Sequence, residues 1–413
     1  MKFGKKALAI FLAALFLMST CAAAAFGLAA GVTQSTDPIA LNDPLEAFSR
    51  LPSFGTELAS PSAKGFPEDI IVVNSNHIQG VARYGAYTII SVSGDSSISS
   101  TGYFFFFSDQ KLLGGFPSPE GLGTHTGAVS VAGDYLACST GTTLFYDLSP
   151  LKSGNLPSAT PVLQVGGVGS TIAIADYNGA PALYAFGGDN LKVLSLPLSG
   201  ASTITELPFA DQSQPSEYDG TGQWGTLNAW TSDNDALVAD TAGNLWFFSL
   251  NSKLTLNNAI SDLIGENGMN YEDVALLYKI DLSSGTATLT GPLATKKLEP
   301  YDSYLFALGS HFRFAASVQV FDADNFAIVS TPSLPGNLFL DAVNGTAKNV
   351  LDLVRPNTLC VNAYTTRPVG EKAPPSFLNI ESRGFLNWLY QLLYRFLSIV
   401  NLEGVLGKLG IKI

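Results

Sequence analysis

The chain has 413 residues, a formal net charge of −12 and 46% hydrophobic residues against 14% charged ones. This composition excludes a disordered chain, which could not use so much core-forming material. It also argues against a nucleic-acid partner, because no run of basic residues is longer than Lys296-Lys297. Forty glycines and 22 prolines without a collagen-like period predict many turns between short strands, so we expect an all-β fold.

Residues 1–25 have the pattern of a signal peptide. A positive start is followed by an apolar run and by small residues that end at Ala23-Ala24-Ala25, an A-x-A cleavage site. We therefore expect a secreted or otherwise extracytoplasmic protein. Cleavage would remove three lysines and no acidic residue, so the charge would change from −12 to −15. The simplest interpretation of this negative net charge is that it keeps the protein soluble outside the cell.

Two other fates of this segment remain open. Cys21 stands where a lipoprotein signal carries its cysteine, although Thr20 departs from the small residue that usually precedes it. Residues 7–36 carry no charge, so an uncleaved, membrane-attached signal anchor is the second alternative.

Residues 26–66, rich in small and polar residues without a sustained period, are interpreted as a linker, and residues 69–74 as a short strand.

From residue 67 to residue 368, a strand-turn-strand pattern recurs. The first unit has strands at 78–82 and 87–92 around the turn Tyr84-Gly85, and the second turns at Gly133-Asp134. Aligned unit starts at 77, 125, 169, 225 and 311 give spacings of about 48, 44, 56 and 86 residues. A period of about 40 to 50 residues with four strands per unit is typical of a β-propeller.

Several expected strands are apolar on both faces, namely 103–107, 143–146 and 245–248. In a propeller each blade lies between two others, so both faces of a central strand must be apolar. A two-sheet sandwich is the alternative, but it would show cleaner alternation. We expect a propeller of about five to seven four-stranded blades, with five favoured.

The fifth unit is separated from the fourth by the longest spacing. Residues 251–272 are interpreted as an insertion with a short helix at 259–264, and the strands expected at 273–282 and 286–293 are the alternative start of a sixth blade. The ring is expected to close through one blade shared by both chain ends, with strands at 70–73 and 358–364.

The three histidines of the chain, His77, His125 and His311, each precede the expected first strand of a unit. The third and fourth units carry Gly169 and Gly225 there. First strands line the channel of a propeller, so the three imidazoles would face one end of it and could bind Zn or Fe. Propeller dioxygenases, which hold iron with four histidines, resemble this arrangement in outline. The alternatives are structural histidines that cap turns, and direct ligand contacts.

Two further sets of residues have structural interpretations. The acidic turns with Asp233, Asp235, Asp322 and Asp324 lack the ligand spacing of a calcium loop and are interpreted as hairpin turns. Cys138 and Cys360 lie in apolar, strand-like runs, which favours buried free thiols over a disulfide.

After an expected linker at 369–383, residues 384–413 contain a strongly apolar helix. Within 384–400 the polar side chains Asn387, Gln391, Arg395 and Ser398 fall on one narrow stripe. About sixteen helical residues span about 24 Å, which is shorter than a hydrocarbon core of about 30 Å. The helix is therefore expected to lie on a membrane surface, to pair with a partner helix in self-association, or to pack on the propeller.

On its repeat pattern, the stretch 67–368 resembles secreted bacterial β-propeller proteins as a class, and this resemblance implies a fold but no activity. Two functions are open. The first is an exported, cell-surface-associated propeller that acts as a non-catalytic binding or scaffold module for a protein or a glycan. The second is a metal-dependent lyase, oxygenase or hydrolase with His77, His125 and His311 as ligands. Whether the protein is an enzyme is left undecided by the sequence.

Overall fold

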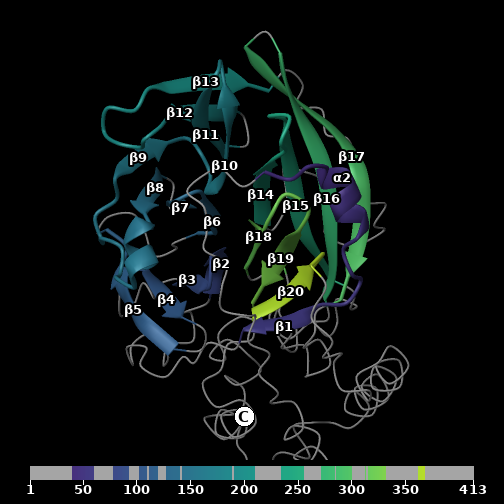
Figure 1. Cartoon of the computed structure of the whole chain (residues 1–413), viewed down its shortest axis with the longest axis horizontal. Coiled ribbons are helices and arrows are strands. Elements are labelled where there is room, and N and C mark those ends of the chain that lie inside the picture. The colour runs from purple at the N-terminus through teal and green to yellow at the C-terminus, as the bar shows by residue number, and fades with distance from the viewer. Residues whose placement is uncertain are drawn as a thin grey trace, which may run out of the picture.

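The computed structural model describes thirteen stretches of the chain: residues 40–59, 78–92, 102–108, 111–119, 127–139, 142–187, 190–209, 234–254, 271–283, 285–299, 312, 315–331 and 361–367. These residues form five four-stranded antiparallel sheets arranged as the blades of a β-propeller (Figure 1). The all-β prediction and the favoured number of five blades are confirmed.

The first three blades are each built from four consecutive strands, given from the innermost to the outermost. Blade one consists of β2 (Ile78–Tyr84), β3 (Tyr87–Val92), β4 (Tyr103–Ser108) and β5 (Lys111–Pro117). Blade two consists of β6 (Val129–Ala132), β7 (Tyr135–Ser139), β8 (Thr142–Asp147) and β9 (Leu163–Gly166), with a short helix η1 (Ser149–Ser153) after β8. Blade three consists of β10 (Thr171–Tyr177), β11 (Ala180–Phe186), β12 (Asn190–Ser195) and β13 (Ile204–Pro208).

Blade four and blade five depart from the expected pattern. Blade four consists of β14 (Asn234–Ala239), β15 (Leu245–Leu254), β16 (Tyr271–Ser283) and β17 (Thr286–Leu298). Blade five consists of β18 (Ala316–Val320), β19 (Phe326–Ser330), β20 (Val361–Thr365) and, from the other end of the chain, β1 (Thr56–Ala59). The strands that could have begun a sixth blade are therefore the third and fourth strands of blade four.

The fourth unit was predicted one strand out of phase. Residues 236–240 were expected as its second strand, but 236–239 belong to the innermost strand, β14, and Asp235 lies in that strand rather than in a turn. The real turn follows at Asp240, whose carboxylate accepts hydrogen bonds from the backbone N–H groups of Ala242 (3.0 Å) and Asn244 (2.8 Å). The first strand expected at 226–230 lies outside the described residues. The insertion expected at 251–272 is shorter, because β15 continues to Leu254 and β16 begins at Tyr271.

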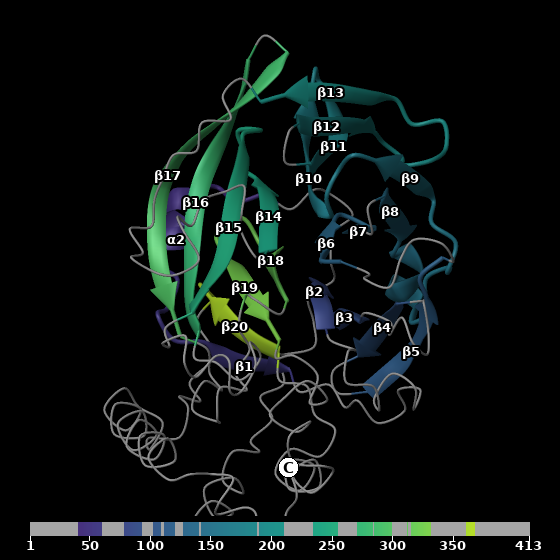
Figure 2. The ribbon, with the colours of Figure 1, turned by 180° about the vertical axis from the view of Figure 1, so that it is seen from behind.

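Closure of the ring through both chain ends is confirmed, but the N-terminal strand is β1 rather than 70–73, which lies outside the described residues. Part of the expected linker thus belongs to the propeller. Helix α2 (Pro44–Ser49) starts at Asp43, whose side chain accepts hydrogen bonds from the N–H groups of Leu45 (3.0 Å) and Glu46 (2.9 Å). It contacts β17, next to which it is seen in Figures 1 and 2.

Five hydrophobic clusters hold the blades together, one at each of the five blade interfaces. Successive residues of one strand enter different clusters, because side chains alternate across a strand. Phe104 and Phe106 pack toward blade two, whereas Phe105 and Phe107 pack toward blade five. This explains why the central strands are apolar on both faces, and the cluster between blades five and one shows that the ring is closed.

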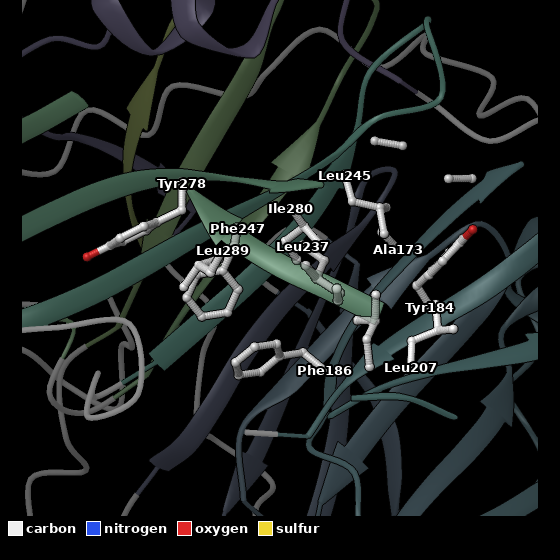
Figure 3. Close-up of a cluster of buried hydrophobic side chains, with 14 of the residues drawn as sticks. Ala173, Tyr184, Phe186, Leu207, Leu237, Leu245, Phe247, Tyr278, Ile280 and Leu289 are labelled. Carbon is white, nitrogen blue, oxygen red and sulfur yellow. The ribbon is translucent and has the colours of Figure 1, made fainter. Parts of the chain in front are cut away.

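The cluster between blades three and four is drawn in Figure 3. Phe186 of β11 and Phe247 of β15 meet there with ring centroids 4.5 Å apart, and Tyr278 of β16 packs against Phe247 at 6.2 Å. The cluster between blades four and five differs, because the N-terminal segment adds Leu41, Phe48 and Leu51 to it. These three side chains are at most 2% exposed, so the segment 40–59 is part of the core.

Candidate functional site

The two ends of the propeller channel are built differently. The innermost strands of neighbouring blades lie side by side around the axis and begin at the same end. We call this end the loop face, because the connections into the innermost strands lie there, and we call the opposite end the turn face, because the first hairpin turn of each blade lies there. The sequence prediction of a histidine site concerns the loop face, because each histidine precedes an innermost strand in the chain.

His77, His125 and His311 themselves lie outside the described residues. The strands that follow them begin at Ile78, Val129 and Ala316, so the histidines stand one, four and five residues before a strand rather than directly before each one. Metal ligation by these residues stays a prediction. Within the described stretches, no group of three or more His, Cys, Asp or Glu residues could hold a metal ion.

Side chains of the preceding blade hold the chain where it enters blades two and three. The Ser91 hydroxyl on β3 donates to the carbonyl of Gly127 at 2.9 Å, and the Thr143 hydroxyl on β8 donates to the carbonyls of Val168 and of Gly169, the latter at 3.2 Å. Gly80 has no room for a side chain, since a Cβ there would lie 2.6 Å from the backbone nitrogen of Val129. These contacts fix the height at which neighbouring blades begin.

The same arrangement recurs, in a more polar form, before blade five. Phe312, which follows His311 in the sequence, is completely buried, and its carbonyl accepts a hydrogen bond from the Asn234 amide of β14. Its N–H donates to the Asp273 carboxylate of β16 at 3.3 Å, and the Ser252 hydroxyl of β15 donates to the same oxygen at 2.6 Å. Asp273 is itself fully buried. The backbone of Phe312 is thus held by two side chains of blade four, Asn234 and Asp273, and Ser252 supports Asp273.

This polar group was missed from the sequence. Ser252 and Asp273 are direct cross-strand partners, but their strands are separated by a connection of sixteen residues, 255–270, so no short motif joins them. The available signal was the polar interruption Asn251-Ser252 at the end of the apolar strand that starts at Leu245. Chemically, the group offers hydrogen bonds to a backbone. By accepting the N–H of Phe312, the buried Asp273 carboxylate positions this backbone segment.

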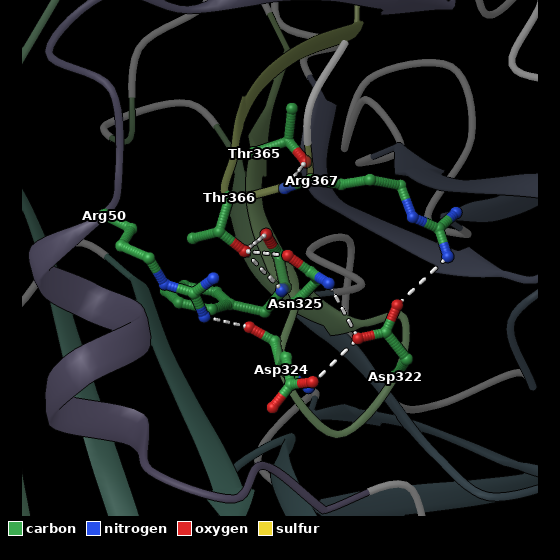
Figure 4. A network of polar contacts seen from close by, with 8 residues as sticks. Arg50, Asp322, Asp324, Asn325, Thr365, Thr366 and Arg367 are labelled. Atoms are coloured by element: carbon green, nitrogen blue, oxygen red, sulfur yellow. Dashed lines mark hydrogen bonds and ion pairs between the residues drawn. The ribbon is translucent and has the colours of Figure 1, made fainter. Parts of the chain in front are cut away.

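The acidic turn of blade five, at residues 321–325, joins the two ends of the chain on the turn face (Figure 4). The Asp322 carboxylate accepts hydrogen bonds from the Asp324 N–H (3.0 Å), the Asn325 amide (2.9 Å) and the Arg367 guanidinium (3.1 Å). Burial opposes ionisation of Asp322, but these donors and the charge of Arg367 outweigh it and hold the pKa of the carboxyl below its usual value. The interpretation as a hairpin turn is confirmed for Asp322 and Asp324. Asp233 lies outside the described residues.

Cys138 is a free thiol on β7 and is fully buried. Burial raises the pKa of this thiol far above its ordinary value, so it is expected to be unreactive in the folded protein. Cys360 and Cys21 lie outside the described residues, as do the segments 1–25, 26–39, 369–383 and 384–413.

No known protein family profile and no curated protein sequence matches this chain. What the structure defines is therefore a class, a five-bladed β-propeller whose last blade is completed by an N-terminal strand. None of the helices among the described residues is long and apolar enough to cross a membrane.

Proposed function

We propose that the protein is an exported, cell-surface-associated propeller that binds a protein or a glycan through its loop face and performs no chemistry itself. The observation that carries this proposal is the unequal length of the connections at the two faces. At the turn face, β2 and β3, β6 and β7, and β10 and β11 are joined by two residues each, and the longest connection there, 148–162 between β8 and β9, has fifteen. At the loop face, the connections 209–233, 299–315 and 331–360 contain 25, 17 and 30 residues.

Long connections on a rigid scaffold are where proteins commonly place recognition residues, because their sequence can vary without loss of the core. The longest ones here lead into or out of strands of blades four and five, and 60–77 leads from blade five into blade one. These blades are also the ones whose strands are anchored by Asn234, Asp273 and Phe312. The loop face thus combines long connections with strand ends that are held by hydrogen bonds.

Removal of one long connection tests the proposal. β19 and β20 are adjacent antiparallel strands, so residues 332–360 can be replaced by a four-residue Gly-Ser turn without breaking their pairing. The full chain would be applied to a glycan array and to a panel of purified extracellular proteins. We expect binding that this variant loses and that Ala242→Lys, an exposed change in a turn-face hairpin, retains. Unchanged binding by the shortened variant with an unchanged melting temperature would contradict a role for this connection.

A second candidate, metal-dependent catalysis, is supported by the positions of the histidines. His77, His125 and His311 all fall within loop-face connections, at 60–77, 118–128 and 299–315. Elemental analysis of the purified full chain separates the two functions. Stoichiometric Zn or Fe that is lost in the triple His→Ala variant would favour the enzyme, and absence of bound metal favours the binding module.

A further inference from the structure

Both ends of the described chain leave the propeller at the turn face. At the C-terminal end, β20 finishes at Thr365, which pairs with Ala327 directly after the acidic turn of blade five. At the N-terminal end, the Leu41 N–H donates to the carbonyl of Ala239 at 3.0 Å, next to the first hairpin turn of blade four. Residues 40 and 367 therefore lie on the face opposite the long connections.

The two exits are also held close together. The Asn42 amide donates to the Asp324 carboxylate at 2.9 Å. The Arg367 guanidinium pairs with Asp322 of the same turn at 3.1 Å (Figure 4). A third bond runs from the Arg50 guanidinium to the Asp324 carbonyl. One five-residue turn thus fixes the positions from which both terminal segments depart.

Each terminal segment carries apolar sequence suited to a membrane. Residues 384–400 are apolar apart from one narrow polar stripe, and residues 7–36, which contain no charged side chain, would add a second tether in the form of the protein that keeps its signal segment. We propose that the turn face of the propeller is its membrane-proximal face and that the partner of this side of the molecule is a lipid surface. This inference rests on the proposed surface attachment and adds its direction, with the loop face pointing away from the membrane.

The dimensions favour this direction. The stretch 368–383 contains sixteen residues, which reach at most about 50 Å when extended. An innermost strand of seven residues, such as β2, is about 23 Å long. A chain that leaves from the turn face can use its whole reach toward the membrane, whereas in the inverted orientation both ends would first have to pass the height of the blades.

The exposed acidic side chains of the turn face, such as Asp176, give no attraction to anionic lipid. The turn face is therefore held at the membrane by its tethers and not by its charge.

Energy transfer to labelled vesicles tests the orientation. Two variants of the full chain would carry the donor dye, each with one added cysteine in a Cys21→Ser and Cys360→Ser background, one on blade two and one on blade three. Ala180→Cys is exposed at the turn face, and Gly166→Cys is exposed toward the loop face, where a Cβ meets nothing within 4 Å. The background without either change controls for labelling of the buried Cys138. The vesicles would be phosphatidylcholine with a rhodamine lipid acceptor.

We expect stronger energy transfer from position 180 than from position 166 in the vesicle-bound protein. Equal transfer, or stronger transfer from position 166, would overturn the orientation while leaving surface attachment intact. Failure of the full chain to sediment with vesicles would instead overturn the attachment itself, and the orientation with it. Binding of a ligand by the loop face is measured separately, so its failure is distinguishable from both.

Discussion

Replacement of Phe48 by alanine tests whether the N-terminal segment is part of the propeller core. The Phe48 side chain is 2% exposed, packs in the cluster between blades four and five, and lies with its ring centroid 6.0 Å from that of Phe248. Loss of a buried phenylalanine costs about 3 to 5 kcal/mol, since the transfer free energy and the remaining cavity both contribute. We expect the variant to lose this amount of the free energy of unfolding.

Leu45 on the same helix provides the matched control. Its side chain is 40% exposed, so Leu45→Ala should change the free energy of unfolding by no more than about 0.5 kcal/mol. Urea unfolding followed by far-UV circular dichroism measures both variants, and the shift in midpoint is the readout. Equal midpoints for Phe48→Ala and Leu45→Ala would refute the packing of the segment 40–59 into the blade interface.

Three further predictions concern blade contacts, pH and thiol chemistry. Gly80→Ala should lower the melting temperature measured by calorimetry, because its Cβ would lie 2.6 Å from the Val129 nitrogen. Gly166→Ala is the control and should leave the melting temperature unchanged, since its Cβ would meet nothing within 4 Å. An unchanged melting temperature for Gly80→Ala would contradict the close approach of blades one and two. Asp322 should stabilise the fold above its unfolded pKa of about 3.9, and this contribution should be lost as the pH falls through the lower folded value. Asp322→Asn should therefore show a shallower loss of stability below about pH 4 in acid titrations, and identical curves would count against the contact with Arg367. Cys138 should react with a thiol reagent only after addition of denaturant, and fast reaction of the native Cys21→Ser, Cys360→Ser variant would contradict its burial.

The fold was predictable from the sequence where turn residues and apolar strands indicate the same strand boundaries that the contacts between blades require. The hairpins of the first three blades have glycine or asparagine at their turns, and Gly85, Gly133, Asn178 and Gly179 all adopt positive φ. Apolar runs such as 103–107 specify strands covered on both sides. These two signals were enough to give the blade architecture and the number of units.

The remaining features depend on contacts between distant residues. The sequence of 40–59 resembles a linker because its few apolar residues show no periodic pattern. They become buried only by packing against blades four and five. Asp43 and Pro44 did mark a helix start, but a helix of six residues leaves little periodicity to detect. Similarly, Asn234, Ser252 and Asp273 converge on Phe312 only after the ring has closed, so sequence spacing could not bring them together.

Hydrogen–deuterium exchange of the full chain, with and without a ligand identified on the array or the panel, tests the central claim most directly. Binding through the loop face predicts slower exchange in peptides from the connections 209–233, 299–315 or 331–360, and unchanged exchange in the turn-face peptides around Asn178 and Asp324. Protection confined to the turn-face peptides would contradict the account, because it would place the ligand on the face from which both chain ends depart.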